Sequence, residues 1–255
     1  MRRLLICLLL FSATGSIAQP LKYTIANTHS HNDYEQKTPF WAAYNEGFGS
    51  IEADIFLQDG PLLVGHDTNE IKAGRTLEEY YLRPLFSCMQ KNGGYPYPDT
   101  SRSLQILIDV KTDSIATLDK LISELKKYPR LCNNAHLSWV ISGNRPDPSL
   151  FTGYPSFISF DGVLHYNYSA EALGKILLMS DDLEHYTKWK GKGKIPEKDR
   201  LRLFTAVSHA HGLRKPVRFW DSPDFPNAWS QLMRLRVDYI NTDHIPELGS
   251  FLKKL

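Results

Sequence analysis

The chain has 255 residues, of which 42% are apolar and 23% charged, so it can bury one substantial core without disulfide or metal support, and we expect one domain. Its formal net charge is only +2. Loss of Arg2 and Arg3 with a cleaved leader would bring that charge to zero, which leaves no basic footprint for nucleic acid and excludes nucleic acid as a partner.

The first predicted element is a secretory signal over residues 1–18. Two arginines precede an apolar stretch at residues 4–11, and small residues follow as far as Ala18, an order typical of signal peptides. A membrane span needs about 20 apolar residues, more than this stretch provides. We therefore expect cleavage after Ala18, export to the periplasm or the medium, and a mature domain of residues 19–255.

Eight short apolar or β-branched runs predict the strands of a parallel sheet. They cover residues 23–28, 50–56, 104–110, 137–141, 157–160, 201–207, 217–220 and 239–241. Apolar residues at helical intervals predict helices over residues 76–90, 114–128, 169–179, 227–235 and 246–255. Strands that alternate with helices are typical of βα units. Eight such strands predict an α/β fold of one (β/α)8 TIM barrel.

Two stretches interrupt this alternation, at residues 92–103 and 188–198, and both are typical of surface loops. Beyond the predicted signal the chain keeps only Cys88 and Cys132, too few for a disulfide scaffold. We expect two packing cysteines, although an exported protein could pair them.

Polar clusters stand at the ends of the early predicted strands, where barrels of this kind collect their catalytic groups. Side chains two residues apart on a strand project to the same face, so Glu52 lies with Asp54, and Asp109 with Lys111. Converging carboxylates repel one another unless a cation lies among them. We therefore predict Glu52, Asp54 and Asp109 as ligands of one hard divalent cation, Mg²⁺ or Ca²⁺.

Two histidines, His31 and His66, also stand in these clusters. Cleavage of a phosphodiester requires removal of a proton from the attacking oxygen and delivery of one to the leaving oxygen. Imidazole titrates near neutral pH, so a facing pair of histidines can divide the two tasks. The metal and Lys111 would then meet the charge on the phosphoryl oxygens.

The order of these residues resembles the superfamily of glycerophosphodiester phosphodiesterases and phosphatidylinositol-specific phospholipases C. A strand-end histidine is followed by the E-x-D pair, by Asp59-Gly60 with a later His66-Asp67, and by an acid-x-Lys pair, and residues 237–243 resemble the closing strand of glycerophosphodiesterases. The resemblance implies a phosphodiesterase barrel with His31 and His66 as the acid and base, Glu52, Asp54 and Asp109 as metal ligands, and Lys111, Asn32 and Trp220 as substrate contacts.

The chain departs from glycerophosphodiesterases at two points. His31-Asn32-Asp33 stands where those enzymes usually have His-Arg-Gly, and is similar to the altered-inheritance-of-mitochondria protein group and to venom-type phospholipases D. The stretch between His66 and Asp109 leaves little room for the insertion that caps many glycerophosphodiesterase sites.

The resemblance also carries expectations about the substrate. It implies a small phosphodiester or a phospholipid head group, transient contact with a membrane surface, and a monomer. The family's chemistry suggests that a substrate hydroxyl attacks first and leaves a cyclic phosphate.

Two other interpretations remain open. His29 and His31 could open the transition-metal site of an amidohydrolase-type barrel that closes with Asp243. That design needs ligands on the middle strands, where none of the available histidines has a convincing strand-end position: His136, His165, His209 and His211. We therefore interpret His29 as a packing or supporting residue, and His185 as a surface or packing residue. The barrel could also be inactive and bind a phosphorylated lipid or glycan.

Overall fold

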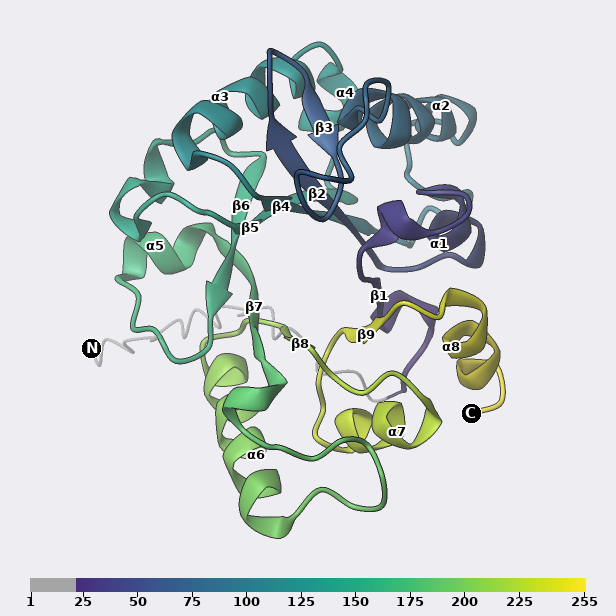
Figure 1. Cartoon of the computed structure of the whole chain (residues 1–255), viewed down its shortest axis with the longest axis vertical. Helices are drawn as coiled ribbons and strands as arrows, with labels where there is room; N and C mark the ends of the chain where they lie inside the picture. The colour runs from purple at the N-terminus through teal and green to yellow at the C-terminus, as the bar shows by residue number, and fades with distance from the viewer. Residues whose placement is uncertain (1–21) are drawn as a thin grey trace, which may run out of the picture.

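Eight parallel strands form a ring in the computed structural model, which describes residues 22–255. The predicted signal lies outside the described residues. The strand order is β8-β7-β6-β5-β4-β2-β1-β9 (Figure 1). A parallel bridge between Arg218 and Tyr239 joins β8 to β9 and closes the ring. The predicted (β/α)8 TIM barrel is confirmed.

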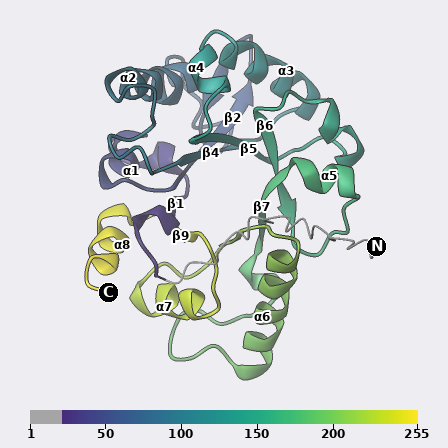
Figure 2. The ribbon, with the colours of Figure 1, turned by 180° about the vertical axis from the view of Figure 1, so that it is seen from behind.

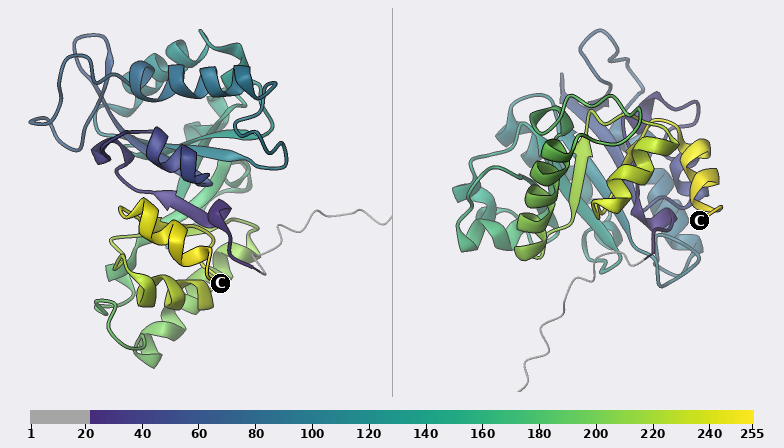
Figure 3. Two further views of the ribbon diagram at one scale, coloured as in Figure 1. Left: turned by 90° about the vertical axis from the view of Figure 1, so that its right-hand side faces the viewer. Right: turned by 90° about the horizontal axis from the view of Figure 1, so that it is seen from below.

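The barrel strands are short and consist largely of apolar and β-branched residues. They are β1 (Thr28–Ser30), β2 (Ser50–Leu57), β4 (Leu104–Val110), β5 (Leu137–Gly143), β6 (Ile158–Val163), β7 (Ile176–Asp182), β8 (Val217–Trp220) and β9 (Ile240–Thr242). One further strand, β3 (Leu62–Val64), pairs antiparallel with β2, with Ile55 opposite Val64. The loop that follows β3 projects from the ring (Figure 3, left).

Helices surround the ring in chain order, as the views from its two sides make clear (Figures 1 and 2). They are α1 (Trp41–Glu46), α2 (Arg83–Lys91), α3 (Ser114–Leu125), α4 (Pro129–Cys132), α5 (Ala170–Lys175), α6 (Glu197–Gly212), α7 (Pro226–Arg234) and α8 (Ile245–Leu252). Shorter helical turns are η1 (Ile25–Asn27), η2 (Asp33–Glu35), η3 (Glu78–Leu82, a π-helical turn), η4 (Pro148–Gly153) and η5 (Leu183–His185). None of the helices in residues 22–255 has the length and apolar content needed to cross a membrane.

The strands bury both of their faces. Their outward side chains join the helices in one large apolar cluster, whereas Leu107, Val140 and Leu178 form a separate small cluster with Tyr239. Because successive side chains of a strand alternate between faces, this second cluster lies inside the barrel. Closer to the carboxyl ends of the strands the interior becomes polar. The barrel interior therefore consists of this small apolar cluster and, on its carboxyl-terminal side, a group of charged side chains.

One predicted strand and part of one predicted helix were wrong. Residues 201–207 belong to α6, where the buried side chains are Leu203, Val207 and Ala210, a helical spacing, while Leu201 and Phe204 are exposed. The sixth barrel strand is instead β7, which the sequence predicted as the end of a helix over 169–179. A strand buried on both faces is a continuous apolar run without alternation, so periodicity does not distinguish it from a helix.

The first predicted strand was also placed too early. Residues 25–27 form the turn η1, because the Thr24 side chain accepts a hydrogen bond from the Ala26 N–H and Asn27 Oδ1 accepts one from the Thr24 N–H. Side chains that bond to nearby backbone in this way compete with strand formation. The strand β1 therefore begins at Thr28. Cys88 and Cys132 form no disulfide within residues 22–255.

Candidate functional site

One cavity of about 360 Å³ lies at the carboxyl ends of the barrel strands. All eight residues predicted to form the site contribute to its lining: His31, Asn32, Glu52, Asp54, His66, Asp109, Lys111 and Trp220. A larger cavity of about 690 Å³ lies at the opposite ends of the strands, where Gly49, Leu104 and Pro216 line it. Catalytic groups of such barrels lie at the carboxyl ends, so the smaller cavity is the candidate site.

The three predicted carboxylates converge in this cavity. Glu52 and Asp54 lie two residues apart on β2, and Asp54 is in register with Asp109 on β4. One oxygen of each carboxylate lies within 4.8 Å of the others. The arrangement follows from the strand geometry, since residues i and i+2 share a face and parallel neighbours in register lie side by side.

Burial and mutual repulsion determine the electrostatics of the cluster. Burial and the charges of Glu52 and Asp109 raise the pKa of Asp54 to about 7, despite the nearby Lys111 ammonium. Burial and the Glu52 charge likewise raise the pKa of Asp109. Asp54 Oδ1 is buried and makes no hydrogen bond within the described part of the chain. A buried carboxylate oxygen without a partner is costly, and a divalent cation would satisfy it.

Two cationic side chains already oppose the carboxylates. Lys111 Nζ lies 2.9 Å from Asp54 Oδ2 and 3.2 Å from Asp109 Oδ1. Arg218, buried on β8, places Nη1 2.9 Å from Glu52 Oε2. Burial alone raises the pKa of Glu52, but Arg218 and His29 hold it well below its usual range. Glu52 is therefore ionised, and its negative charge contributes to the raised pKa values of Asp54 and Asp109.

His31 is held by an acidic partner from the last barrel strand. Its Nδ1 lies 2.8 Å from Asp243 Oδ1, which leaves Nε2 as the nitrogen available to a substrate. Burial lowers the pKa of His31, but the hydrogen bond to Asp243 and nearby negative charge outweigh it, and the net shift is upward. His31 therefore keeps its second proton at a higher pH than a free imidazole.

His66 reaches the same cavity from the projecting loop. The antiparallel β3 returns the chain alongside β2, so the Gly65 N–H donates to the Asp54 backbone carbonyl at 3.4 Å. His66 Nδ1 lies 3.6 Å from Asp54 Oδ2 and 3.3 Å from the Tyr34 hydroxyl. His31 and His66 thus approach one cavity from different strands, as the sequence predicted.

The two remaining predicted residues, Asn32 and Trp220, also line the cavity. Asn32 has a left-handed backbone with φ of 44°, and its Oδ1 lies 2.8 Å from the Tyr34 hydroxyl. The Trp220 side chain ends β8 and is 40% exposed.

His29 is not directed into the cavity but supports Glu52. It is fully buried, with Nδ1 2.7 Å from Ser50 Oγ and Nε2 2.8 Å from Glu52 Oε2. Burial and the neighbouring Arg218 lower the pKa of His29 to about 4, so the ring is neutral. This environment favours the supporting role over the metal-ligand role that an amidohydrolase-type site would require.

The sequence missed three members of the site. Arg218, the pairing of Asp243 with His31, and the Tyr34 hydroxyl, 2.8 Å from Asp54 Oδ2, were not predicted as part of it. Arg218 stands between apolar residues in a predicted buried strand, and a charge there was a usable signal, because buried charges are paired. Nothing in the sequence distinguishes Tyr34 from a core tyrosine.

Two family models match separate parts of the chain. Residues 22–140 match the model of the AIM6-like phosphodiesterase domain, and residues 216–246 match that of the Glycerophosphoryl diester phosphodiesterase family. The first match includes seven of the eight predicted residues, and the second includes Trp220.

Two curated relatives are similar to most of the chain. The chain is 27% identical over 302 residues to Altered inheritance of mitochondria protein 6 of Kluyveromyces lactis, covering 89% of this chain and 72% of the relative. It is 26% identical to the protein of that name from Eremothecium gossypii, covering 89% and 69%.

The fold is similar to a glycerophosphodiester phosphodiesterase from Parabacteroides distasonis, with a TM-score of 0.56, 14% identity, and coverage of 89% of this chain and 97% of that one. A second such enzyme, from Agrobacterium tumefaciens, has a TM-score of 0.51, 15% identity and the same coverage. Together these matches support a glycerophosphodiester phosphodiesterase-like superfamily for the chain.

Proposed function

We propose that this chain is an exported, metal-dependent phosphodiesterase that cleaves a glycerophosphodiester or a phospholipid head-group ester. The observation that carries the proposal is the meeting of His31 and His66 with three carboxylates around one cavity. The superfamily and its structural neighbours support phosphodiester chemistry. A volume of about 360 Å³ is at the small end for ligand sites and favours a small diester or a head group.

Glu52, Asp54 and Asp109 would hold one divalent cation, Mg²⁺ or Ca²⁺. The donor set is all oxygen, which suits these hard ions, and Asp54 Oδ1, which has no hydrogen-bond partner among the described residues, supports the assignment. When bound, such an ion supplies positive charge that polarises a phosphoryl oxygen. Lys111 adds a positive charge in the same cavity. Asn32 and Trp220 also line this cavity and would contact the substrate.

The two histidines divide the proton transfers. Asp243 holds a proton on His31 Nδ1 and raises the pKa of the ring, which suits His31 to give a proton to the leaving oxygen. His66, which lines the same cavity, takes the proton of the attacking hydroxyl. Each such role is worth about 10²–10⁴ in rate.

We assign the attack to a hydroxyl of the substrate beside the phosphate. Its oxygen forms a bond to phosphorus as His66 takes its proton, the bond to the leaving oxygen breaks, and His31 protonates that oxygen. The products are a cyclic phosphate and an alcohol. Phosphorus NMR at early times tests this step: a cyclic species is expected first, and a linear phosphomonoester without it would refute the cyclic route.

The test of the activity itself is a turnover screen on the signal-free chain. Substrates are bis-para-nitrophenyl phosphate, glycerophosphodiesters and phospholipids, each with Mg²⁺, Ca²⁺ or Zn²⁺. We expect turnover with Mg²⁺ or Ca²⁺ that EDTA and His31→Ala abolish and that His209→Ala, a change at an exposed histidine of α6, leaves intact. If the chain bound a substrate but turned over none of the three substrate classes, an inactive barrel would be favoured. Activity that requires Zn²⁺ and His29 would favour the amidohydrolase-type alternative.

Export, oligomeric state and membrane contact are separate parts of the proposal. Export predicts that protein recovered from the periplasm or medium begins at Gln19, which N-terminal sequencing tests. Sedimentation should give a monomer. Flotation with phospholipid vesicles should detect only weak, reversible binding.

A further inference from the structure

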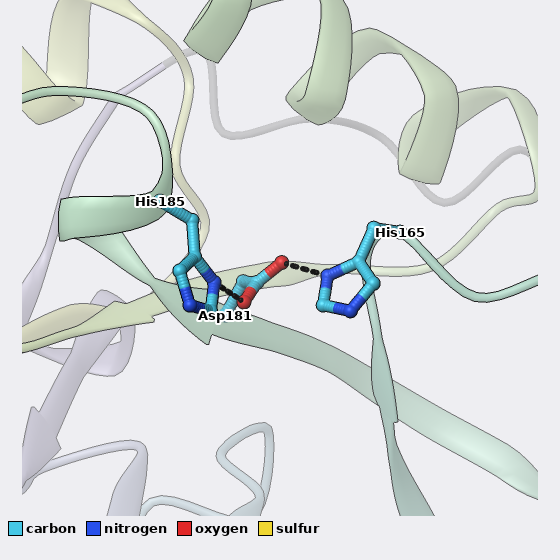
Figure 4. Close-up of side chains that lie close together, drawn as sticks. All are labelled: His165, Asp181 and His185. Atoms are coloured by element: carbon cyan, nitrogen blue, oxygen red, sulfur yellow. Dashed lines mark hydrogen bonds and ion pairs between the residues drawn. The ribbon is translucent and has the colours of Figure 1, made fainter.

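Two histidines and one aspartate form a second polar cluster outside the candidate site. His165 follows β6, Asp181 lies on β7, and His185 ends η5, so the three side chains come from two neighbouring strand ends (Figure 4). His165 Nδ1 lies 2.9 Å from Asp181 Oδ2, and His185 Nδ1 lies 2.8 Å from Asp181 Oδ1. His165 thus has the strand-end position that the sequence did not predict, because β6 extends to Val163.

This cluster and the candidate site lie on opposite faces of the sheet. Asp181 is in register with Phe219, which belongs to the apolar layer between strands and helices. The preceding residue, Ser180, faces the barrel interior, where its Oγ accepts a hydrogen bond from Arg218. Since neighbouring side chains alternate, Asp181 points away from the cavity that Arg218 lines. Changes at the second cluster can therefore be separated from changes at the first.

The Asp181 carboxylate is buried and already positioned. The side chain is 3% exposed, its Oδ1 accepts from the Asp182 N–H at 2.9 Å, and its Oδ2 accepts from the Tyr186 hydroxyl at 2.8 Å. Burial raises the pKa of Asp181, but hydrogen bonds from the two imidazoles and Tyr186 hold it below its ordinary value. A fixed anion is thus presented to two imidazoles.

The two imidazoles remain adjustable. Their side chains are 64% and 56% exposed, so small rotations change the positions of their nitrogens at little cost. One ligand atom from each of the three residues lies within 4.8 Å of the others. Ligands of one tetrahedral Zn²⁺, at bond lengths of about 2.0–2.2 Å, lie roughly 3.3 Å apart, so a modest closure of the two exposed rings suffices.

The donor set distinguishes this cluster from the carboxylate cluster. Imidazole nitrogen is a preferred ligand of Zn²⁺ and other transition ions, whereas Mg²⁺ and Ca²⁺ prefer oxygen. Two imidazoles and one carboxylate match the three-ligand sites that leave a fourth position to water. The exposed rings also give an ion direct access from solvent, which a metal site needs.

We propose that His165, Asp181 and His185 form a Zn²⁺ site separate from the candidate active site. The ion would tie the loop after β6 to the turn η5 after β7. It would replace the two hydrogen bonds that the imidazoles make to the carboxylate with direct bonds to one cation.

Zn²⁺ titration by calorimetry on the chelator-treated, signal-free chain tests the site. We expect His165→Ala and His185→Ala each to weaken one binding event by more than the roughly 10–100-fold that loss of a mere outer hydrogen-bond partner costs. His209→Ala is the matched control. Asp109→Asn should keep this binding event, since Asp109 belongs to the other cluster.

Two further measurements complete the test. Zn²⁺ at 100 times its dissociation constant should raise the melting temperature of the wild type by roughly 5–10 °C and that of His165→Ala by much less, and metal-free His165→Ala should melt near the wild type. Co²⁺ should give a tetrahedral visible spectrum that the same variant loses. The proposal would be overturned if neither histidine change weakened any Zn²⁺ binding event, or if the only change that did so were Asp109→Asn. Either result would hold whatever the outcome of the phosphodiesterase assays.

Discussion

Arg218→Met should make the stability of this barrel depend on a divalent cation. Arg218 is buried beside Glu52, at 2.9 Å, and it also lies 2.6 Å from His29 Nε2. Methionine keeps much of the apolar volume of the side chain but removes its charge. Glu52 then remains ionised in the interior without its main partner, while Lys111 stays with Asp54 and Asp109.

The magnitude follows from the burial of the pair. Removing one partner of a buried ion pair costs about 3–5 kcal/mol, because the other charge is left uncompensated. For a chain of this size the melting temperature falls by roughly 6–20 °C, at about 2–4 °C per kcal/mol. A cation present at 100 times its dissociation constant adds about 2.7 kcal/mol of stability. The variant should bind the ion more tightly than the wild type and so gain more at the same concentration.

Thermal unfolding in EDTA and in a series of Mg²⁺ or Ca²⁺ concentrations measures both effects. Glu52→Gln combined with Arg218→Met should recover most of the loss, since the unpaired charge is gone. Arg200→Met, at an exposed ion pair with Glu197 on α6, should leave the midpoint unchanged. An Arg218→Met protein that melts like the wild type, or one whose loss no cation offsets, would refute the charge balance described for this site.

Three further predictions concern Asp243, Gly143 and Asp109 in the candidate site. Asp243→Asn removes the partner that holds the pKa of His31 above its ordinary value against burial. Because His31 acts as the acid and loses its proton as pH rises through this pKa, the basic limb of the kcat/KM profile should move to lower pH. An unmoved limb would contradict the role of His31. Gly143→Ala would place a Cβ 2.2 Å from Asp109 Oδ1 at a φ of +67°, so calorimetry should find weaker metal binding and unfolding should show a loss of about 1–2 kcal/mol; Gly174→Ala, with open space around it, is the control. Asp109→Asn should lower metal affinity and turnover together while the circular dichroism spectrum stays native, and wild-type turnover would remove the ion from the mechanism.

Local patterns in the chain predicted the fold class and a set of side chains that line one cavity. The E-x-D pair on β2 and the D-x-K pair that begins on β4 each occupy one face because strand side chains alternate. Carboxyl ends of parallel strands meet at one mouth, so eight residues chosen along the sequence could be expected to line one cavity. Distances within such clusters depend on strand geometry that every barrel shares.

The sequence was insufficient where both faces of an element are buried or where a partner is remote. The apolar run of β7 has no alternation, and the spacing in α6 contains a strand-like stretch, so the two were exchanged. Arg218 meets Glu52 across 166 positions of chain, and Asp243 meets His31 across 212. The sequence by itself supplies the residue types, and local strand geometry sets the faces that they occupy. The charge that balances Glu52, the acid that orients His31 and the second cluster at Asp181 depend on closure of the barrel, which brings distant strands together.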